Sequence, residues 1–111
     1  MIEIKKADKQ LKEKLDIKCE AYVCTDKGET LGFVEYEYVN KDLHILKVEA
    51  NESLLADGLV RQTMSNALDC GMETAKFEGA AQKRLFEIRI IKNEQQKSLD
   101  ILEFFMKINH I

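Results

Sequence analysis

Three cysteines, Cys19, Cys24 and Cys70, are the most nucleophilic side chains in the sequence. Their number is odd and no two are spaced as in a CxxC motif, which argues against a disulfide framework and against a zinc site. Nothing next to Cys70 in the sequence supplies the positive charge that would lower its thiol pKa. We therefore expect three reduced thiols and no cysteine nucleophile.

The histidines and Ser53 are the next candidates for chemistry. His44 lies near the start of a strand-like run and His110 is the penultimate residue. Neither has a partner at the spacing of metal ligands, so we expect no metal site. Ser53 lacks the strand–turn–helix Gly-x-Ser-x-Gly context of a hydrolase nucleophile. These residues thus predict neither a metal centre nor a serine enzyme.

Alternating polar residues mark one strand-like run. Glu35 and Glu37 lie two residues apart, and they could flank an acceptor amine or simply form an exposed acidic sheet face. We favour the exposed face. Tyr36 and Tyr38 share the run, and with Tyr22 they are expected to pack within the sheet. Tyr36 or Tyr38 could act as an acid only if the fold brings it to a cleft.

The spacing of apolar residues along the chain predicts the strands and helices that must position these side chains. Apolar residues alternate from Ile17 to Thr25, and turn residues at 26–29 precede a β-branched and aromatic run at 30–39, which predicts a hairpin. After a turn at 40–42, Leu43, Ile45, Leu46 and Val48 indicate a central, well-covered strand. A short strand at 1–5 and a charged helix at 7–15 precede the hairpin.

A stripe of apolar residues at helical spacing follows and predicts a long helix. Gly71, at the C′ position, ends this helix. A strand at 73–77 completes a βαβ unit, so the strands on either side of the helix should run parallel. We expect a second helix at 80–91, a closing strand within 96–101 and a final helix at 102–107. The stripe consists of Leu55, Leu59, Val60, Met64, Ala67 and Leu68.

The predicted fold is a mixed sheet of the α/β (α+β) class. Antiparallel hairpin strands lead into a parallel βαβ unit, with helices packed on the sheet, in a single domain over residues 1–111. In the tail, Phe104, Phe105 and Ile108 should dock on the body of their own chain, and the alternative is that they cover a sheet edge of a second copy, as in a homodimer.

This order, with the segments LGFVEYEY, LHILKVEA, SLLADGLVRQTMSNALDCGM and QKRLFEIRI, resembles the GNAT superfamily of acyl-CoA N-acyltransferases over residues 17–91. The resemblance implies that acyl-CoA enters where the strand at 43–50 splays from the next strand. It also implies that the loop opening the main helix holds the pyrophosphate of coenzyme A on its backbone N–H groups, which suits an anion because a helix start carries free donors.

The resemblance places the coenzyme A contacts at the end of the strand at 43–50 and at the start of the helix. Gly58 keeps the last small position of the family's loop motif, while Ala56 replaces a glycine and Ser53 replaces Arg or Gln. Ser53 could serve as N-cap. We expect Asp57, in the first turn, and Glu52 to repel the pyrophosphate. The implied contacts are Val48, Ala50, Ser53, Leu54, Leu55, Ala56, Asp57 and Gly58.

The catalytic residues that the resemblance implies are sparse. Glu49 occupies a place where some members carry a general base, and the alternative, which we favour, is a solvent-facing strand residue. Phe86 stands where the family uses Tyr to protonate the departing thiolate, and Phe has no hydroxyl. The family's helix motif is otherwise met only by Leu85, with Gly79 and Gln82 at its Asn and Ala places. Only eleven residues separate Lys5 from Ile17, too few for the family's usual acceptor-binding helices.

Two functions follow. The first is a minimal N-acetyltransferase that binds acetyl-CoA and transfers the acyl group to a small amine; the second is a binding or scaffold module of the same fold without turnover. A net charge of −3 and a pI near 5.4 argue against nucleic-acid and membrane-surface partners. No apolar run approaches the roughly 20 residues that span a bilayer, and the charged N-terminus lacks a signal peptide, so a cytoplasmic location is expected.

Overall fold

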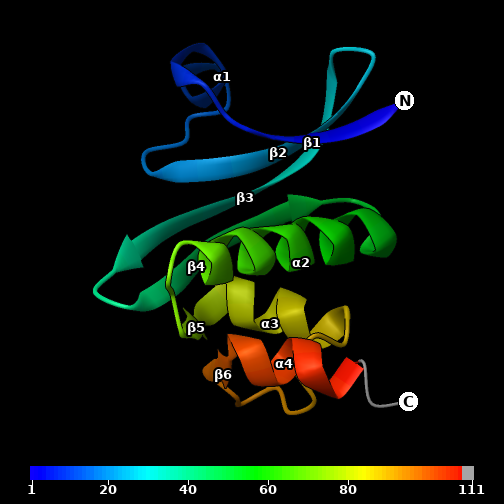
Figure 1. Ribbon diagram of the computed structural model, residues 1–111. Helices are drawn as coiled ribbons and strands as arrows, with labels where there is room; N and C mark the ends of the chain where they lie inside the picture. Colours follow the sequence, from blue (N-terminus) through cyan, green and yellow to red (C-terminus); the bar gives the residue numbers. More distant parts are fainter. Residues whose placement is uncertain (109–111) are drawn as a thin grey trace.

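The computed structural model describes residues 1–108 as one mixed sheet of six strands in the order β1-β2-β3-β4-β5-β6, with helices packed on it (Figure 1). The prediction for His110 lies outside the described residues, as does the side chain of Ile108. The elements are β1 (Ile2–Lys6), α1 (Lys9–Lys14), β2 (Glu20–Asp26), β3 (Glu29–Val39), β4 (Asp42–Ala50), α2 (Ser53–Asp69), β5 (Thr74–Phe77), α3 (Gly79–Glu87), β6 (Ser98–Asp100) and α4 (Ile101–Ile108).

Two hydrophobic clusters cover the sheet. The larger cluster joins α2 to the sheet through residues such as Val34, Tyr36 and Leu59, and it extends to Leu85 in α3. The smaller cluster lies under α1, where Leu11 and Leu15 pack against the strands. The helical stripe predicted for α2 is confirmed, and its buried residues are Ala56, Leu59, Val60, Thr63, Met64 and Ala67.

The hairpin of β2 and β3 is confirmed, with a later start for β2. Lys27 and Gly28 both have positive φ, as a two-residue type I′ turn requires. The strand begins at Glu20 rather than Ile17. Its expected first residues leave the ladder because the Glu35 carboxylate accepts the backbone N–H groups of Lys18 and Cys19, each at 3.1 Å.

The helix α2 ends as the sequence predicts. Cys70 is its C-cap and Gly71 has a φ of +90°. The N–H of Met72 donates to Ala67 O at 2.9 Å, and that of Gly71 donates to Leu68 O at 3.0 Å, which is the hydrogen-bond pattern of a Schellman motif. The chain then enters β5, which is parallel to β4, so the βαβ unit is confirmed.

The strand β4 contains a β-bulge that the sequence pattern did not predict. Glu35 pairs with Lys47 and Tyr36 with Ile45, so Leu46 has no partner in β3. The expectation that Leu46 is well covered is wrong, because the bulge turns it outward and leaves it 42% exposed. Leu43 and Ile45 are buried as expected.

The strands β4 and β5 stay together only briefly. Their register runs from the pair Asp42–Thr74 to the pair Ile45–Phe77, and β5 ends there. The remaining half of β4, residues 46–50, continues without β5, and α3 packs against β4. We call the place where the two strands part, between residues 46–50 and the start of α3, the fork.

The C-terminal elements agree with prediction except for the end of α3. The helix stops at Glu87 instead of Ile91, because Arg89 adopts a φ of +65°. The N–H of Ile90 donates to Leu85 O at 2.9 Å, and the turn buries Ile90 and Ile91. The strand β6 pairs with β5 in the same chain, and Phe104 and Phe105 of α4 pack on the larger cluster, so the own-chain docking predicted for these two residues is confirmed.

Candidate functional site

A pocket of about 230 Å³ lies at the fork. It opens where the last β4–β5 pair, Ile45 with Phe77, gives way to the bulge at Leu46. Those three residues are its apolar lining, and each belongs to one of the two strands. Its polar lining residues are His44, Lys76, Glu78 and Lys97. The end of one strand pair therefore brings apolar and ionisable groups around a single cavity.

The N-terminus of α2 follows directly on the freed half of β4. Glu52 is the N-cap residue and makes no side-chain cap hydrogen bond. Because the first intrahelical bond runs from the N–H of Ala56 to Glu52 O, at 3.0 Å, the N–H groups of Ser53 to Leu55 have no acceptor within the helix. Three backbone donors and the positive end of the helix dipole thus lie beyond the end of β4.

Three expectations about this segment are wrong. Ser53 is the first helical residue and not the N-cap, since Glu52 occupies that position. Residues 53–58 are helix rather than loop, because the helical hydrogen bonds begin immediately after β4. Asp57 lies one turn further along than expected, and the first turn of α2 contains no acidic residue. The first turn of α2 therefore carries less negative charge than the sequence suggested. The N-cap residue Glu52 directly precedes this turn.

The charge of Asp57 is also compensated. The Nε of Arg61 donates to its Oδ2 at 2.8 Å, one turn away from the start of the helix. The guanidinium of Arg61 in turn lies 5.1 Å from the ring centroid of Phe104. The Asp57 carboxylate is thus held by a partner toward the C-terminal side, which weakens its repulsion of an anion at Ser53. A Cβ added at Gly58 would meet nothing within 4 Å.

Arg84 connects α3 to the end of β4. Its Nη2 donates to the backbone oxygen of Ala50 at 2.9 Å, and its Nη1 lies 3.5 Å from Oε1 of Glu87. The side chain is only 22% exposed. The sequence analysis missed Arg84, although it directly precedes the Leu85-Phe86 pair. Its acceptor lies 34 residues away, and only the fold brings the two together.

The predicted base Glu49 faces solvent at the same strand end. Its carboxylate is 3.6 Å from Nζ of Lys47 and its side chain is 60% exposed. It stands opposite Phe33 and is not among the residues that line the fork pocket. His44, which the sequence analysis considered only as a metal ligand, does line that pocket. The roles of both residues stay predictions.

The other predicted coenzyme A contacts occupy distinct environments. Val48 pairs with Val34. Its side chain packs against the larger cluster, and so do the side chains of Ala50 and Leu55. Ala56 is buried and Leu54 is highly exposed. Backbone groups at the end of β4 and at the start of α2, rather than these side chains, are therefore what the site offers to a ligand.

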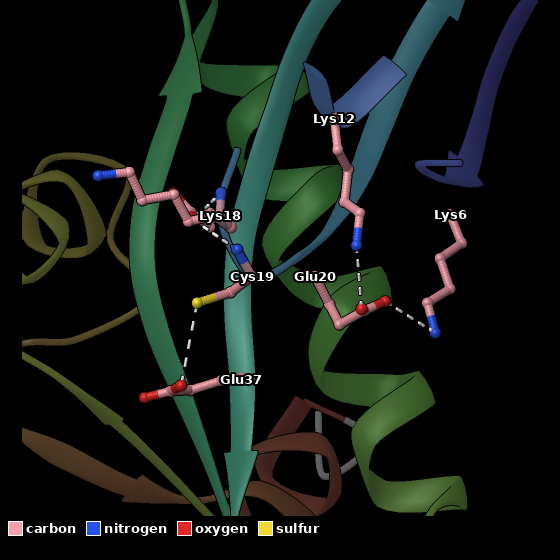
Figure 2. A network of polar contacts seen from close by, with 7 residues as sticks. Lys6, Lys12, Lys18, Cys19, Glu20 and Glu37 are labelled. Carbon is pink, nitrogen blue, oxygen red and sulfur yellow. Dashed lines mark hydrogen bonds and ion pairs between the residues drawn. The ribbon is translucent and has the colours of Figure 1, made fainter. Parts of the chain in front are cut away.

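Glu35 and Glu37 hold the chain together on the sheet face opposite α2. Figure 2 shows the Cys19 side chain directed toward Glu37. Glu35 binds the backbone that precedes β2, and the thiol of Cys19 donates to Oε2 of Glu37 at 3.9 Å. Burial and the carboxylate of Glu37 raise the pKa of Cys19, so the thiol keeps its proton. Glu20 stands opposite Tyr36 and therefore lies on the α2 face of the sheet, where it pairs with Lys6 and Lys12. These acidic residues serve structural contacts and are half-buried rather than freely exposed.

The tyrosines form a row of stacked rings. Tyr22 and Tyr36 have centroids 5.2 Å apart and nearly parallel planes, and Tyr38 lies 5.3 Å from Tyr36. Burial raises the pKa of Tyr36 and of Tyr38, so both phenols hold their protons firmly. Neither lines the fork pocket. Their packing role is the one that the sequence favoured.

The remaining candidates show no special environment. All three cysteines are free: Cys19 is half-buried, Cys24 is buried and Cys70 is exposed. Within residues 1–108, no group of three or more His, Cys, Asp or Glu side chains could hold a metal ion. In the same part of the chain, no helix is long and apolar enough to cross a bilayer.

Comparison with known proteins finds similar proteins by structure and none by sequence. No protein-family model matches the sequence, and no curated protein is significantly similar to it. Among solved structures, the ribosomal-protein-S18-alanine N-acetyltransferase of Escherichia coli is 14% identical, with a TM-score of 0.61 over 78% of this chain and 75% of that chain.

Two further structures agree. An acetyltransferase of Bacillus subtilis in complex with CoA is 15% identical, with a TM-score of 0.62 over 80% of this chain and 73% of that chain. A GNAT-family acetyltransferase of Staphylococcus aureus is 7% identical, with a TM-score of 0.61 over 80% of this chain and 78% of that chain. At these identities the likeness shows the fold: this chain has the GNAT acyltransferase fold, a mixed α+β sheet with helices packed on it.

Proposed function

We propose that the protein is an acyl-CoA-dependent N-acyltransferase that transfers an acetyl group to a small amine. One observation carries this proposal. The strand β4 leaves β5 after four residue pairs and then runs straight into the uncapped N-terminus of α2. A single substrate can therefore meet free strand backbone and a helix N-terminus in succession, and the pocket lies next to the start of the free strand. The B. subtilis structure of the same fold, solved with CoA, supports this use of the fold.

The residues at the fork suit coenzyme A chemically. The backbone of Val48 and Ala50 can pair with the amides of the pantetheine arm, as one strand pairs with the next. The free N–H groups of Ser53 to Leu55 can bind the pyrophosphate, and Gly58 leaves open space beside the second turn. In the free protein Arg84 occupies the carbonyl of Ala50. That hydrogen bond is the contact that the incoming substrate must displace.

The reaction needs a base for the amine and a proton for the thiolate. The amine nitrogen forms a bond to the acyl carbon, the carbon–sulfur bond breaks, and the ammonium proton passes to a base. His44 lines the pocket and imidazole is the commonest general base, while Glu49 is the residue that the family resemblance implies. We propose that water supplies the proton to the thiolate, because Phe86 has no hydroxyl.

Phe86 also favours the second function, a coenzyme A-binding module without turnover. Its ring is 37% exposed on α3. If the chain is an enzyme, Phe86→Tyr should raise the rate of thiol release from acetyl-CoA several-fold, since a positioned acid typically contributes at least tenfold. If it is only a binding module, neither the native chain nor the variant will release thiol with any amine, although both will bind.

Binding is tested first, by thermal unfolding with acetyl-CoA. At a hundredfold excess over Kd the native state should gain about 2.7 kcal/mol. Ser53→Pro is the decisive variant, because it removes one free N–H at the first helical position, where proline is tolerated, and Glu52 already has the extended backbone that precedes proline. The variant should unfold at an unchanged temperature without ligand and bind acetyl-CoA several-fold more weakly.

The matched control is Ser65→Ala, on the same helix but away from its N-terminus. It should bind acetyl-CoA as the native chain does. No stabilisation of the native chain at millimolar acetyl-CoA would contradict the proposed function. Equal affinity of Ser53→Pro and the native chain would contradict the assignment of the pyrophosphate to the start of α2.

A further inference from the structure

The polar lining of the fork pocket contains both signs of charge. Lys76 and Lys97 contribute ammonium groups, Glu78 a carboxylate and His44 an imidazole. They come from four separate places, namely β4, β5, the N-cap of α3 and the segment before β6. This combination suits a ligand that presents complementary charges at close spacing.

One cation in the pocket is already neutralised and one is not. Nζ of Lys76 lies 3.0 Å from Oδ2 of Asp42. Among residues 1–108, no ion pair involves Lys97. Its carbonyl accepts the N–H of Phe77 at 3.0 Å, which fixes its backbone next to β5. The exposed side chain of Lys97 therefore starts from the pocket wall with its charge available to an anionic group of a ligand.

Glu78 provides the opposite charge on the other side of Phe77. It is the N-cap residue of α3, but its side chain makes no cap hydrogen bond. Within the described part of the chain, its carboxylate also takes part in no ion pair of 4.0 Å or less. The pocket thus holds one available ammonium and one available carboxylate, which together match a zwitterion.

The pocket has room for a small ligand. Its volume of about 230 Å³ can receive an amino acid with a short side chain, and the pocket is partly open to solvent. The apolar residues Ile45, Leu46 and Phe77 can receive a methyl or methylene group next to the charged ends.

We propose that the fork pocket binds a small α-amino acid as the acyl acceptor. Lys97 binds its carboxylate, Glu78 attracts its ammonium group, and His44 takes the proton that the nitrogen must lose. The free amine then attacks the thioester of acetyl-CoA, so that a carbon–nitrogen bond forms, the carbon–sulfur bond breaks and the thiol leaves. This inference rests on the proposed function, because the acyl donor is acetyl-CoA lying in the fork.

Binding of the acceptor is measured without the donor, by NMR of the histidine side chains. The chain has two histidines, so a His110→Gln variant assigns the imidazole signals of His44. Addition of L-alanine should shift the His44 signals in a saturable way, whereas L-alaninamide, which lacks the carboxylate, should bind at least fivefold more weakly. Lys97→Gln should abolish this preference, and Glu78→Gln should weaken both ligands.

Lys92→Gln is the matched control, an exposed lysine of the same connection that does not line the fork pocket. It should bind L-alanine as the native chain does. Thermal unfolding of each variant checks that the fold is intact, and Lys97→Arg, which keeps the charge, should retain the preference for L-alanine. Loss of the preference in Lys97→Arg would indicate a structural role for the residue and overturn its assignment.

Thiol release then separates the two proposals. With acetyl-CoA, L-alanine should react at least tenfold faster than L-alaninamide, judged by kcat/KM. Equal rates for the two amines would overturn the inference and leave the proposed function standing. Saturable binding of L-alanine with no thiol release and no acetyl-CoA binding would overturn the proposed function and the acceptor role with it, and would leave only an amino acid-binding pocket. Faster release from succinyl-CoA than from acetyl-CoA, lost in Lys97→Gln, would assign Lys97 to a carboxylate of the acyl group and would also overturn the inference.

Discussion

The two edges of β4 behave differently. Toward β3 the strand is paired along its whole length, in eight register pairs interrupted by the bulge at Leu46. Toward β5 it is paired only from Asp42 to Ile45. The side chains follow this division, since Leu43 is fully buried between both neighbours while Leu46 and Glu49 lie exposed. One half of β4 belongs to the core and the other half forms one side of the fork.

The difference shows how a stable sheet can also present free backbone. Unpaired strand groups are costly when buried and invite pairing when exposed. At the fork this edge is partly satisfied by a side chain, since Arg84 donates to Ala50 O. A hydrogen bond from a flexible arginine can be exchanged for a ligand more easily than a ladder of strand bonds. Binding at the fork therefore need not disturb the paired edge.

The strongest test of the comparison truncates one leucine in each half of β4. Leu43→Ala should lower the free energy of unfolding by about 3 kcal/mol, because it opens a cavity at a fully buried position. Leu46→Ala should cost about 0.5 kcal/mol or less, since the side chain is outside the core. Urea unfolding measures both. Similar losses for the two variants would mean that the bulge does not divide the strand.

The next test disturbs the paired edge at its far end. Gly32 faces Ala50, and a Cβ built on it would lie 2.6 Å from the backbone oxygen of Glu49 and 2.7 Å from Cβ of Ala50. Gly32→Ala should therefore cost about 2 kcal/mol, because backbone must move to admit the methyl group. Gly58→Ala is the control and should raise stability by about 0.5 kcal/mol, since its methyl group meets nothing and alanine favours helix. Thermal unfolding shows whether each variant is less or more stable than the native chain.

A smaller effect is expected where Arg84 joins the unpaired edge. Arg84→Met keeps the apolar stem and removes the donor to Ala50 O, so unfolding should become easier by about 1 kcal/mol. Glu87→Gln removes only the more exposed partner of Arg84 and should cost less than about 0.5 kcal/mol. If Glu87→Gln were the more harmful change, the ion pair and not the link to β4 would be the reason for the position of Arg84.

The smallest effect is expected at the end of α3, the helix whose start forms one side of the fork. Arg89 has a φ of +65°, which glycine adopts without the steric cost that other residues meet. Arg89→Gly should therefore raise the free energy of unfolding by about 0.5 kcal/mol, part of the gain being lost to the greater freedom of glycine in the unfolded chain. Lys83→Gly, in the middle of the same helix, should lower it by up to about 1 kcal/mol.

Much of the fold could be predicted from local patterns. The hairpin followed from alternation and from Gly28, and the extent of α2 from its apolar stripe and Gly71. Less of the site could be predicted. The uncapped turn at Ser53 and the ion pair of Asp57 with Arg61 depend on where α2 begins, which a residue pattern gives only to within a few positions.

The sequence by itself determined the order of the elements, the parallel βαβ unit and the residues of the core, because these depend on periodicity and on turn chemistry within short segments. Only the tertiary structure decided where β4 leaves β5, which opened the pocket, and where the bulge against β3 turns Leu46 outward. It also brought Arg84 to Ala50, and His44, Glu78 and Lys97 around one cavity. The hydrogen bond of Arg84 joins residues 34 positions apart in the chain, and it forms only when strands and helices have taken their places.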